Sequence, residues 1–376
     1  MTNRPPEERK LNLLIAIAGL GIGGAEVVVQ RLAESIDRRR FNVAIACLKA
    51  QGPIGEVVAR TGGADIIVLA DPDAKRTNYL SFLKMLKLIR ERNIDVVHTH
   101  TTDALADAAL CKVFRPSLRL IHTFHFGNYP HRPPRELFLD RVFSRLASYL
   151  LAVGDVQRKQ LKSVFGFRDG SVGRIWNGVV IPRGDGAEFR ARFAKPGGVL
   201  VGTMATFIEQ KGLFDLLEVA RKVHDVRKDV RFVVIGDGFL RPKLEARRKE
   251  LGLDEVVSLP GWVTDAAEKA LPACDIFFQP SLWEAMSIAL LEAMGAGKPS
   301  VTTRVGETPF VVEDGVDAIL VNAKDVDGMT AALLKLIDDP ALRHRMGDAA
   351  LAKARSKFTI DHMTRAYEAV YAGGKA

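Results

Sequence analysis

The sequence predicts an α/β protein with two doubly wound domains, each built around a parallel sheet. Short apolar runs alternate with segments whose apolar residues have helical spacing, which is typical of βαβ units. A stretch rich in glycine and proline interrupts this alternation after about residue 154, and the alternation restarts near residue 199. A chain of 376 residues is long enough for two or three domains.

Each series of apolar runs gives six expected strands. Residues Ala25, Val28, Val29, Leu32 and Ile36 predict the first helix, which follows a strand and a glycine turn. The first series predicts strands at 11–18, 43–48, 66–69, 96–98, 120–123 and 150–153, with helices at 79–92 and 136–150. The second predicts strands at 199–205, 231–235, 256–259, 276–279, 300–303 and 318–321, with helices at 214–226 and 287–295. We therefore expect domains at 1–185 and 186–357, followed by a C-terminal helix and tail at 358–376.

Composition indicates a folded protein of ordinary polarity. Hydrophobic residues make up 47% and charged residues 26%, so wholesale disorder and coiled coil are not expected. No apolar run approaches the 18 or so residues of a membrane span, and the first ten residues are polar, so we expect a cytoplasmic protein. Cys47, Cys111 and Cys274 lie in apolar segments without CxxC spacing, which predicts reduced core residues.

Positive charge is concentrated in the first half of the chain. The net charge of the chain is +9. Residues 1–185 contain 28 basic and 18 acidic residues, whereas residues 186–376 contain 26 basic and 27 acidic residues. This asymmetry favours an anionic partner there, although a merely soluble basic surface is the alternative. No aromatic-studded motif accompanies these residues, so nucleic acid is not expected.

An amphipathic pattern follows some of these basic residues. The apolar residues of segment 138–146 would allow peripheral contact with an anionic membrane and a lipid-linked acceptor, or they could pack against the sheet. The residues of this pattern are Phe138, Leu139, Val142, Phe143 and Leu146, and the basic residues are Arg38, Arg39, Arg40, Arg115, Arg119, Arg132 and Arg135.

A glycine turn follows the first expected strand. Gly19, Gly21 and Gly24 satisfy the G-x-G-x-x-G pattern of dinucleotide-binding proteins. However, the strand at 43–48 runs into Lys49 and not into the carboxylate that binds an NAD ribose. Binding of another phosphate, or close helix packing, is the preferred interpretation.

Two glutamates eight residues apart form the most specific pattern. Glu284 follows an expected strand, and Glu292 interrupts an apolar helix two turns later, so both carboxylates could point the same way. Ligands bind beyond the carboxyl ends of strands in open parallel sheets. The alternative for Glu292 is an exposed helix residue.

Several short patterns together resemble the retaining glycosyltransferases of family 4. They are Glu284-x7-Glu292, Gln210-Lys211-Gly212, Ile235-Gly236-Asp237-Gly238, Asp275 before Pro280-Ser281, Asn177-Gly178-Val179 and Gly23-Gly24-Ala25-Glu26. The resemblance covers residues from about 11 to 370. It implies the GT-B fold, in which two Rossmann-like domains face a cleft that holds a nucleotide sugar. It also implies that the helix expected near 359–372 crosses back onto the first domain.

The resemblance implies roles for individual residues of the second domain. Glu292 would bind the ribose hydroxyls, Glu284 the donor sugar, and Lys211 the diphosphate leaving group. Backbone amides following Met286, Ser287 and Ile288 would add donors to the phosphates. No cofactor and no metal are then required. The DxD-like pairs Asp71/Asp73 and Asp325/Asp327 are interpreted as turns.

The chain departs from the family at one cationic position. Ala205 and Thr206 stand where family members commonly carry an arginine. Losing such a contact could cost about 2–4 kcal/mol at a developing pyrophosphate. Arg304, just after the strand at 300–303, is a conceivable replacement.

Histidines follow two strands of the first domain. His98 and His100 end one strand and His122 and His125 the next, at the edge where ligands bind. The family has a histidine that contacts the donor sugar, which best matches His125; His98 or His100 could instead orient the loop. Backbone amides of Gly23 and Gly24 are expected to approach the donor phosphates.

The resemblance implies a retaining hexosyltransferase. It would move sugar from a UDP- or GDP-sugar to a glycan or lipid-linked acceptor in cell-surface polysaccharide or glycolipid synthesis. A nucleotide-sugar 2-epimerase would use the same fold without an acceptor. A catalytically silent nucleotide-sugar-binding protein is the second alternative, which Thr206 makes credible.

Overall fold

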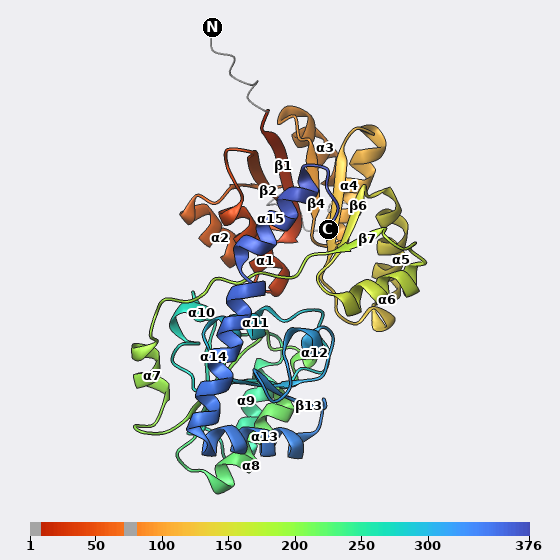
Figure 1. The fold of residues 1–376 in the computed structure, drawn as a ribbon. Coiled ribbons are helices and arrows are strands. Elements are labelled where there is room, and N and C mark those ends of the chain that lie inside the picture. The colour runs from red at the N-terminus through yellow and green to blue at the C-terminus, as the bar shows by residue number, and fades with distance from the viewer. Residues whose placement is uncertain (1–8, 71–80) are drawn as a thin grey trace. The chain divides into compact units, whose positions relative to one another are not determined.

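The computed structural model describes residues 9–70 and 81–376, which form two compact units. Unit 1 comprises the chain up to Asn177 together with Ile360–Ala376, and unit 2 comprises Gly178–Thr359. Each unit contains one parallel sheet covered by helices (Figure 1). None of the helices in the described ranges is both long and apolar enough to cross a membrane.

Unit 1 holds a seven-stranded parallel sheet in the order β3-β2-β1-β4-β5-β6-β7. Its strands are β1 (Leu11–Gly19), β2 (Phe41–Ala50), β3 (Asp65–Val68), β4 (Val96–Thr99), β5 (Arg119–Phe124), β6 (Tyr149–Ala152) and β7 (Val172–Arg174). Its helices are α1 (Gly24–Ser35), α2 (Gly52–Thr61), α3 (Ser81–Glu91), α4 (Thr102–Phe114), η1 (Tyr129–His131), α5 (Pro134–Phe143), η2 (Ser144–Leu146), α6 (Asp155–Phe165) and α15 (Ile360–Tyr371).

Unit 2 holds a six-stranded sheet in the order β10-β9-β8-β11-β12-β13. Its strands are β8 (Leu200–Met204), β9 (Arg231–Ile235), β10 (Val257–Gly261), β11 (Ile276–Gln279), β12 (Ser300–Thr303) and β13 (Ala318–Val321). Its helices are α7 (Ala187–Phe193), η3 (Glu209–Lys211), α8 (Leu213–Val226), α9 (Arg241–Glu250), α10 (Ala266–Lys269), α11 (Ile288–Gly295), α12 (Thr308–Val311), α13 (Val326–Asp338) and α14 (Pro340–Lys357).

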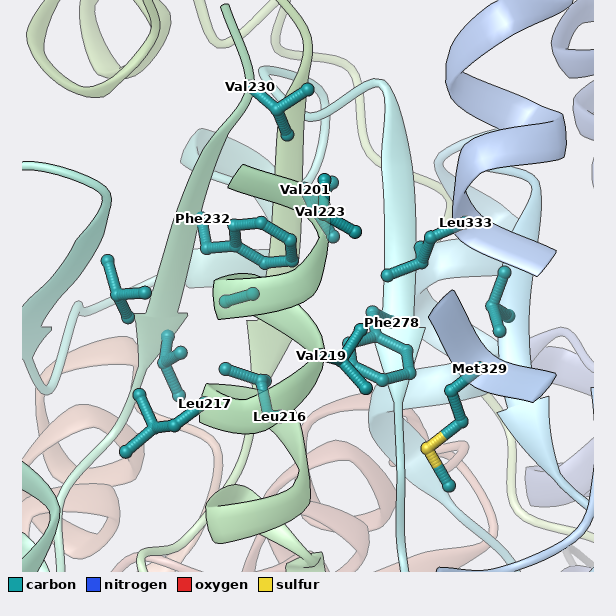
Figure 2. Close-up of a cluster of buried hydrophobic side chains, with 14 of the residues drawn as sticks. Val201, Leu216, Leu217, Val219, Val223, Val230, Phe232, Phe278, Met329 and Leu333 are labelled. Atoms are coloured by element: carbon teal, nitrogen blue, oxygen red, sulfur yellow. The ribbon is translucent and has the colours of Figure 1, made fainter. Parts of the chain in front are cut away.

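Burial on both faces explains why the strands are continuous apolar runs. Helices cover each parallel sheet on two sides, so successive side chains of central strands such as β4, β5 and β11 are removed from water. In unit 2, Phe232 and Phe278 from the sheet pack against Leu216, Val219 and Val223 of α8 (Figure 2). Met329 and Leu333 of α13 close the same core beside Phe278 (Figure 2). The expected α/β architecture of two doubly wound sheets is confirmed.

Helix α15 returns the end of the described chain to unit 1, where it packs against α1 (Figure 1). The ring of Tyr371 lies edge-on to that of Phe41, with centroids 5.8 Å apart. Glu368 accepts a hydrogen bond from the backbone N–H of Asp37 (2.8 Å) and pairs with Arg40 (3.1 Å). The expected return of the C-terminal helix to the first unit is thus confirmed.

The boundary between the units lies earlier than the expected position at 185. Residues 178–184 are fastened to unit 2 by their backbone. Val179 N–H donates to Phe358 O (2.8 Å). The N–H groups of Arg183 and Gly184 both donate to Glu268 Oε1, each at 2.8 Å. These bonds tie the proline- and glycine-rich segment to unit 2.

The helix expected at 136–150 is shorter than its periodicity suggests. Helix α5 ends at Phe143, a single turn of 3₁₀-helix follows, and β6 begins at Tyr149. Ser148 N–H donates to Leu120 O at 2.6 Å, which draws the chain into the sheet beside β5. Strand β7, which lies in the region expected to be irregular, pairs with β6.

Two further expectations concern cysteines and aspartates. All three cysteines are buried and free, and burial raises the pKa of Cys47 to about 11 and that of Cys111 and Cys274 to about 12, so they are core residues as expected. Asp325 is the N-cap of α13 and accepts from Gly328 N–H, and Asp327 lies in the first turn of this helix, so the pair expected in a turn begins a helix. The pair Asp71 and Asp73, and the start of the helix expected at 79, lie outside the described residues.

Candidate functional site

In unit 2 the strand order reverses between β8 and β11, and this is where ligands bind in open α/β sheets. The segment after β8 carries Gln210 and Lys211 in η3, and the segment after β11 carries Ser281 and Glu284. Leu282 N–H donates to Gln210 O at 2.7 Å, which joins the two segments through their backbones. The topology therefore brings together residues that are about 70 positions apart in the sequence.

Glu284 is the buried centre of this site. Its Oε1 lies 2.6 Å from Lys211 Nζ and accepts a hydrogen bond from Ser281 Oγ at 2.8 Å. Its Oε2 accepts from Gln210 Nε2 at 3.3 Å. A buried carboxylate is costly unless it is paired and hydrogen-bonded, and these three donors meet that requirement. Lys211 and Glu284, both expected in the site from the sequence, are in direct contact.

Two glycines allow backbone segments to approach one another around Glu284. Gly212 has φ +62°, and a Cβ there would lie 2.0 Å from Pro280 O. Gly306 has φ +52°, and a Cβ there would lie 1.9 Å from Glu284 O. Each glycine thus has both a left-handed conformation and no room for a side chain.

Helix α11 begins at Ile288, four residues after Glu284. Ser287 caps this helix, because its Oγ accepts from Leu290 N–H at 3.2 Å while donating to Gln279 Oε1 at 2.6 Å. Met286 and Ile288 flank the cap and are buried. The N-terminus of a helix attracts anions through its free N–H groups and its dipole.

Glu292 lies two turns further along α11 and is buried, with 7% of its surface exposed. The alternative of an exposed helix residue is therefore wrong. Its neighbours Leu290, Leu291, Ala293 and Met294 are buried as well.

Positions 205 and 206, where the resemblance leads us to expect an arginine, carry no charged side chain. Ala205 and Thr206 are partly buried, and Ala205 N–H donates to Ile235 O at 3.0 Å. Arg304 is exposed and pairs with Asp314. The replacement role proposed for Arg304 thus requires this ion pair to open.

Unit 1 has its own strand reversal, between β1 and β4, and a pocket lies at that edge. The pocket has a volume of about 370 Å³. Ala25 in the first turn of α1, three histidines (His100, His122 and His125), and Arg132 contribute to its lining. Gly23 and Gly24 immediately precede Ala25, and Gly23 is the extended N-cap of α1.

The histidines of β4 and β5 form a hydrogen-bonded chain. His125 Nε2 lies 2.9 Å from His100 Nδ1, and His100 Nε2 lies 3.2 Å from His98 Nδ1. His98 Nδ1 lies 2.7 Å from the hydroxyl of Tyr371, and its Nε2 lies 2.8 Å from Thr123 Oγ1. His122 stands apart from this chain and contacts Thr99 Oγ1 at 2.8 Å.

Burial keeps these imidazoles uncharged. Desolvation lowers the pKa of His125 to about 4 and that of His122 to about 3. The pKa values of His98 and His100 lie well below the usual range, first because of burial and then because neighbouring histidines repel a positive charge. All four are therefore neutral at physiological pH.

Sequence reasoning missed a polar cluster in the pocket wall. Arg132 Nε lies 2.8 Å from Asp140 Oδ2, its Nη2 donates to Thr102 Oγ1 at 2.6 Å, and Thr102 donates to Asp140 Oδ1 at 2.8 Å. Burial raises the pKa of Asp140 to about 6, although Arg132 and Thr102 oppose this. Asp140 in the otherwise amphipathic helix α5 was the available signal, since its side chain faces inward.

The fold, two units with one parallel sheet each, is of the GT-B class. Residues 22–183 match the model described as Glycosyltransferase Family 4, and residues 195–339 match the model described as Glycosyl transferases group 1. The chain therefore belongs to the group 1 glycosyltransferases of family 4, as the sequence resemblance implied.

Curated relatives carry glycosyltransferase names. The chain is 34% identical over 178 residues to the lipopolysaccharide core biosynthesis glycosyltransferase LpsD of Rhizobium meliloti, covering 47% of this chain and 50% of that protein. It is 23% identical over 337 residues to the UDP-Gal:alpha-D-GlcNAc-diphosphoundecaprenol alpha-1,3-galactosyltransferase of Escherichia coli, covering 85% of this chain and 86% of that protein. The match thus spans half the length of the first of these relatives.

The fold is shared with solved structures. Anabaena HepE, crystallised in complex with UDP and glucose, superposes with a TM-score of 0.84 at 20% identity and covers 96% of this chain and 99% of its own. WaaG, a glycosyltransferase involved in lipopolysaccharide biosynthesis, gives a TM-score of 0.77 at 16% identity and covers 96% and 100% of the two chains.

Proposed function

We propose that the protein transfers a hexose from a nucleotide sugar to a glycan or lipid-linked acceptor, with retention of anomeric configuration. The observation that carries the proposal is the contact between Lys211 and buried Glu284 at the strand reversal of unit 2. A fixed cation there suits a diphosphate leaving group, and a carboxylate with remaining lone pairs suits sugar hydroxyls.

The described contacts suggest a division of roles in the donor site. Lys211 Nζ has donors left after its bond to Glu284, and these would neutralise charge that develops on the leaving diphosphate. The N-terminus of α11, beginning with Ser287 and Ile288 after Met286, would supply further N–H donors to the phosphates. The buried carboxylate of Glu292 would accept both hydroxyls of the nucleotide ribose.

The pocket of unit 1 would receive hydroxyl groups at the reacting end. His125 lines this pocket and is neutral, so it can exchange hydrogen bonds with a sugar hydroxyl. Gly23 and Gly24 precede α1 and would offer backbone N–H groups to the donor phosphates. Attack would occur on the face that the leaving group vacates, with a donor phosphate oxygen taking the acceptor proton. The protein would mainly orient the reactants.

Donor binding is tested first by thermal shift. The chain is screened against UDP-, GDP-, ADP- and TDP-sugars, with NAD and NADP as controls. A ligand at a hundredfold excess over its Kd stabilises the folded state by about 2.7 kcal/mol. We expect a shift with a UDP- or GDP-sugar that is lost in Glu292→Ala. A shift with NAD or NADP alone would overturn the proposal. The UDP in HepE structures makes UDP-sugars the first choice.

Kinetics then separate the roles of the two charged residues. Lys211→Ala should chiefly lower kcat, because its interaction with the leaving group grows in the transition state. Glu292→Ala should chiefly raise KM for the donor. Lys269→Ala, an exposed lysine of the same unit, is the control and should change neither. Equal effects of the first two variants on both parameters would contradict this division.

Two further properties follow from the resemblance and are tested separately. Product analysis by NMR should show the anomeric configuration of the donor, and inversion would refute retention. Activity should persist in EDTA, and its loss and recovery with a divalent cation would refute metal independence. The names of LpsD and the E. coli galactosyltransferase favour an acceptor of lipopolysaccharide or lipid-diphosphate type.

A silent nucleotide-sugar-binding protein is the second candidate. The observation that favours it is the uncharged Thr206, together with the engagement of Arg304 by Asp314. Donor binding without hydrolysis or transfer across an acceptor panel would support this candidate. If Arg304→Ala left the turnover of an active enzyme unchanged, Arg304 would have no role as the replacement cation.

We also propose that unit 1 contacts an anionic membrane surface from the cytoplasmic side. Large apolar side chains are exposed on the neighbouring helices α4 and α5 and on η2: Phe114 (59%), Phe138 (64%), Val142 (40%) and Leu146 (39%). Phe138, Val142 and Leu146 follow one another at four-residue spacing and form one stripe. The exposed residues Arg135, Arg141 and Arg145 accompany this stripe and would meet anionic headgroups.

The other basic residues singled out in the sequence support this surface less. Arg39 pairs with Asp37, Arg40 with Glu368 and Arg132 with Asp140, so their charges are already neutralised within unit 1. Arg38 and Arg119 donate to backbone carbonyls. The membrane surface is therefore confined to the α4–α5 region.

Vesicle flotation tests this contact. The chain should float with vesicles containing phosphatidylglycerol and not with neutral phosphatidylcholine vesicles, and high salt should weaken binding. The double variant Phe138→Ser, Val142→Ser should lose binding. Phe239→Ser, which removes an exposed phenylalanine of unit 2, should retain it. Equal binding of the two variants would rule out the α5 stripe.

A further inference from the structure

A hydrogen-bonded chain of imidazoles runs from the pocket of unit 1 to the C-terminal helix. It begins at His125 after β5, passes through His100 (2.9 Å) and His98 (3.2 Å), and ends at the hydroxyl of Tyr371 in α15 (2.7 Å). His98 and Tyr371 are 273 residues apart in the sequence and both are buried. The chain therefore couples α15 to a residue that faces the pocket.

Each hydrogen bond between two of these imidazoles needs a proton on one ring nitrogen and a lone pair on the other. A neutral imidazole donates from one nitrogen and accepts at the other, so a chain of neutral imidazoles can be polarised in only two directions. In one direction His125 carries its proton on Nε2, toward His100, and has a lone pair on Nδ1. In the other it carries its proton on Nδ1.

The two hydroxyls bound to His98 decide the direction. Tyr371 approaches Nδ1 and Thr123 approaches Nε2 at 2.8 Å, yet only one ring nitrogen of neutral His98 is unprotonated, so only one of these two hydroxyls can donate to the ring. A phenol is a far more acidic donor than an aliphatic hydroxyl, and the distance of 2.7 Å suits an O–H donor. Tyr371 makes no other hydrogen bond through its hydroxyl within the described residues. Its buried proton would be unsatisfied in the opposite direction.

We propose that Tyr371 sets the tautomer of His125 through His98 and His100. Tyr371 donates to His98 Nδ1, so His98 carries its proton on Nε2 and donates to Thr123. His100 Nε2 lies 3.2 Å from the same Nδ1 of His98 and is a second, weaker donor that shares its lone pair with Tyr371. His100 Nδ1 then accepts from the Nε2–H of His125. Tyr371 is thus a positioning residue for His125.

The consequence for the pocket is a fixed hydrogen-bond acceptor. His125 Nδ1 makes no hydrogen bond to another residue in the described ranges, and His125 lines the pocket. The proposal therefore specifies a ligand that presents a donor, such as a sugar hydroxyl, to Nδ1. The identity of that ligand rests on the proposed glycosyl transfer, whereas the tautomer does not.

Histidine NMR of the 376-residue chain tests the proposal without substrate. Long-range ¹H–¹⁵N spectra of selectively ¹⁵N-histidine-labelled protein distinguish protonated from bare ring nitrogens, and His125→Asn assigns the signals. We expect a neutral Nε2–H tautomer for His125 in the unmodified protein. In Tyr371→Phe, which keeps the buried ring, we expect a shift toward the Nδ1–H tautomer.

Tyr367→Phe is the matched control. Its hydroxyl lies one helical turn away and reaches only Thr123, at 3.4 Å, so the tautomer of His125 should not change. An Nδ1–H tautomer in the unmodified protein, or an unchanged tautomer in Tyr371→Phe, would overturn the proposal. For an active transferase, we expect kcat to fall about tenfold in Tyr371→Phe and less than twofold in Tyr367→Phe. Absence of any transfer would refute the proposed function and leave the tautomer result intact.

Discussion

Breaking the ion pair between Lys211 and Glu284 should destabilise unit 2 in the absence of any ligand. The two charged atoms lie 2.6 Å apart, and at an effective dielectric constant of about 20 their attraction is about 6 kcal/mol before desolvation is subtracted. Removing one partner of a buried pair typically costs about 3–5 kcal/mol. The side chain of Lys211 is 21% exposed, so we expect about 3 kcal/mol for Lys211→Met.

A double-mutant cycle isolates the interaction of the pair. Glu284→Gln keeps the shape but leaves one acceptor oxygen for the two donors Ser281 and Gln210. It should lower the free energy of unfolding by about 2 kcal/mol, a loss limited because Lys211 can turn toward solvent. The double variant contains no uncompensated charge and should also cost about 2 kcal/mol. The expected coupling energy is therefore about 3 kcal/mol, the excess of the summed single losses over the loss in the double variant.

Urea unfolding measured by tryptophan fluorescence provides the assay. A Trp176→Phe background leaves Trp262 and Trp283, both in unit 2, as reporters. With a slope of about 2–3 kcal/mol per molar urea, a loss of 3 kcal/mol lowers the midpoint by about 1 M or more. The exposed pair Lys222–Asp327 is the control cycle and should couple by less than 1 kcal/mol. A coupling of Lys211 to Glu284 below about 0.5 kcal/mol would refute the argument that burial makes this pair strong.

Two further predictions concern backbone conformation and pH. Gly212→Ala should lower the free energy of unfolding by more than about 2 kcal/mol, because a Cβ would lie 2.0 Å from Pro280 O. The control Gly252→Ala (φ +64°, with open space around the Cβ) should lower it by about 1 kcal/mol. Equal urea midpoints of the two variants would contradict this. Acid should destabilise unit 1: unfolded His122 takes up a proton below pH 6.5, whereas folded His122 has a pKa of about 3, so about 2 kcal/mol is lost between pH 7.5 and 5. Asp140, with a raised pKa of about 6, acts in the opposite sense, so His122→Gln is compared with the unmodified chain; equal pH dependence would refute the assignment.

Local patterns predicted much of the sheet. Strands such as Arg231–Ile235 and Ile276–Gln279 have the expected bounds because burial on both faces demands continuous apolar runs. The sequence predicted that Lys211 and Glu284 lie at the same edge of the sheet, since both residues follow strands of one sheet. The exact donors to Glu284, including Gln210, depend on side-chain geometry that spacing does not contain.

Long-range pairing was not predictable from local spacing. The helix expected to extend to residue 150 ends at Phe143, because Ser148 bonds to a strand nearly 30 residues earlier. Arg304 forms an ion pair with Asp314, which follows α12, and its position after a strand did not indicate this contact. The hydrogen bond between His98 and Tyr371 could not be predicted, because local spacing does not show which helix covers the end of β4.

The division of unit 1 between two stretches of sequence has a consequence for biosynthesis. The ribosome makes all of Gly178–Thr359 before it makes α15, so unit 2 can complete its core while unit 1 still lacks one helix. Until then, the ring of Tyr371 does not cover Phe41, and the hydroxyl of Tyr371 does not bond to His98. We therefore expect nascent unit 1 to remain a chaperone client longer than unit 2, although its sequence emerges first.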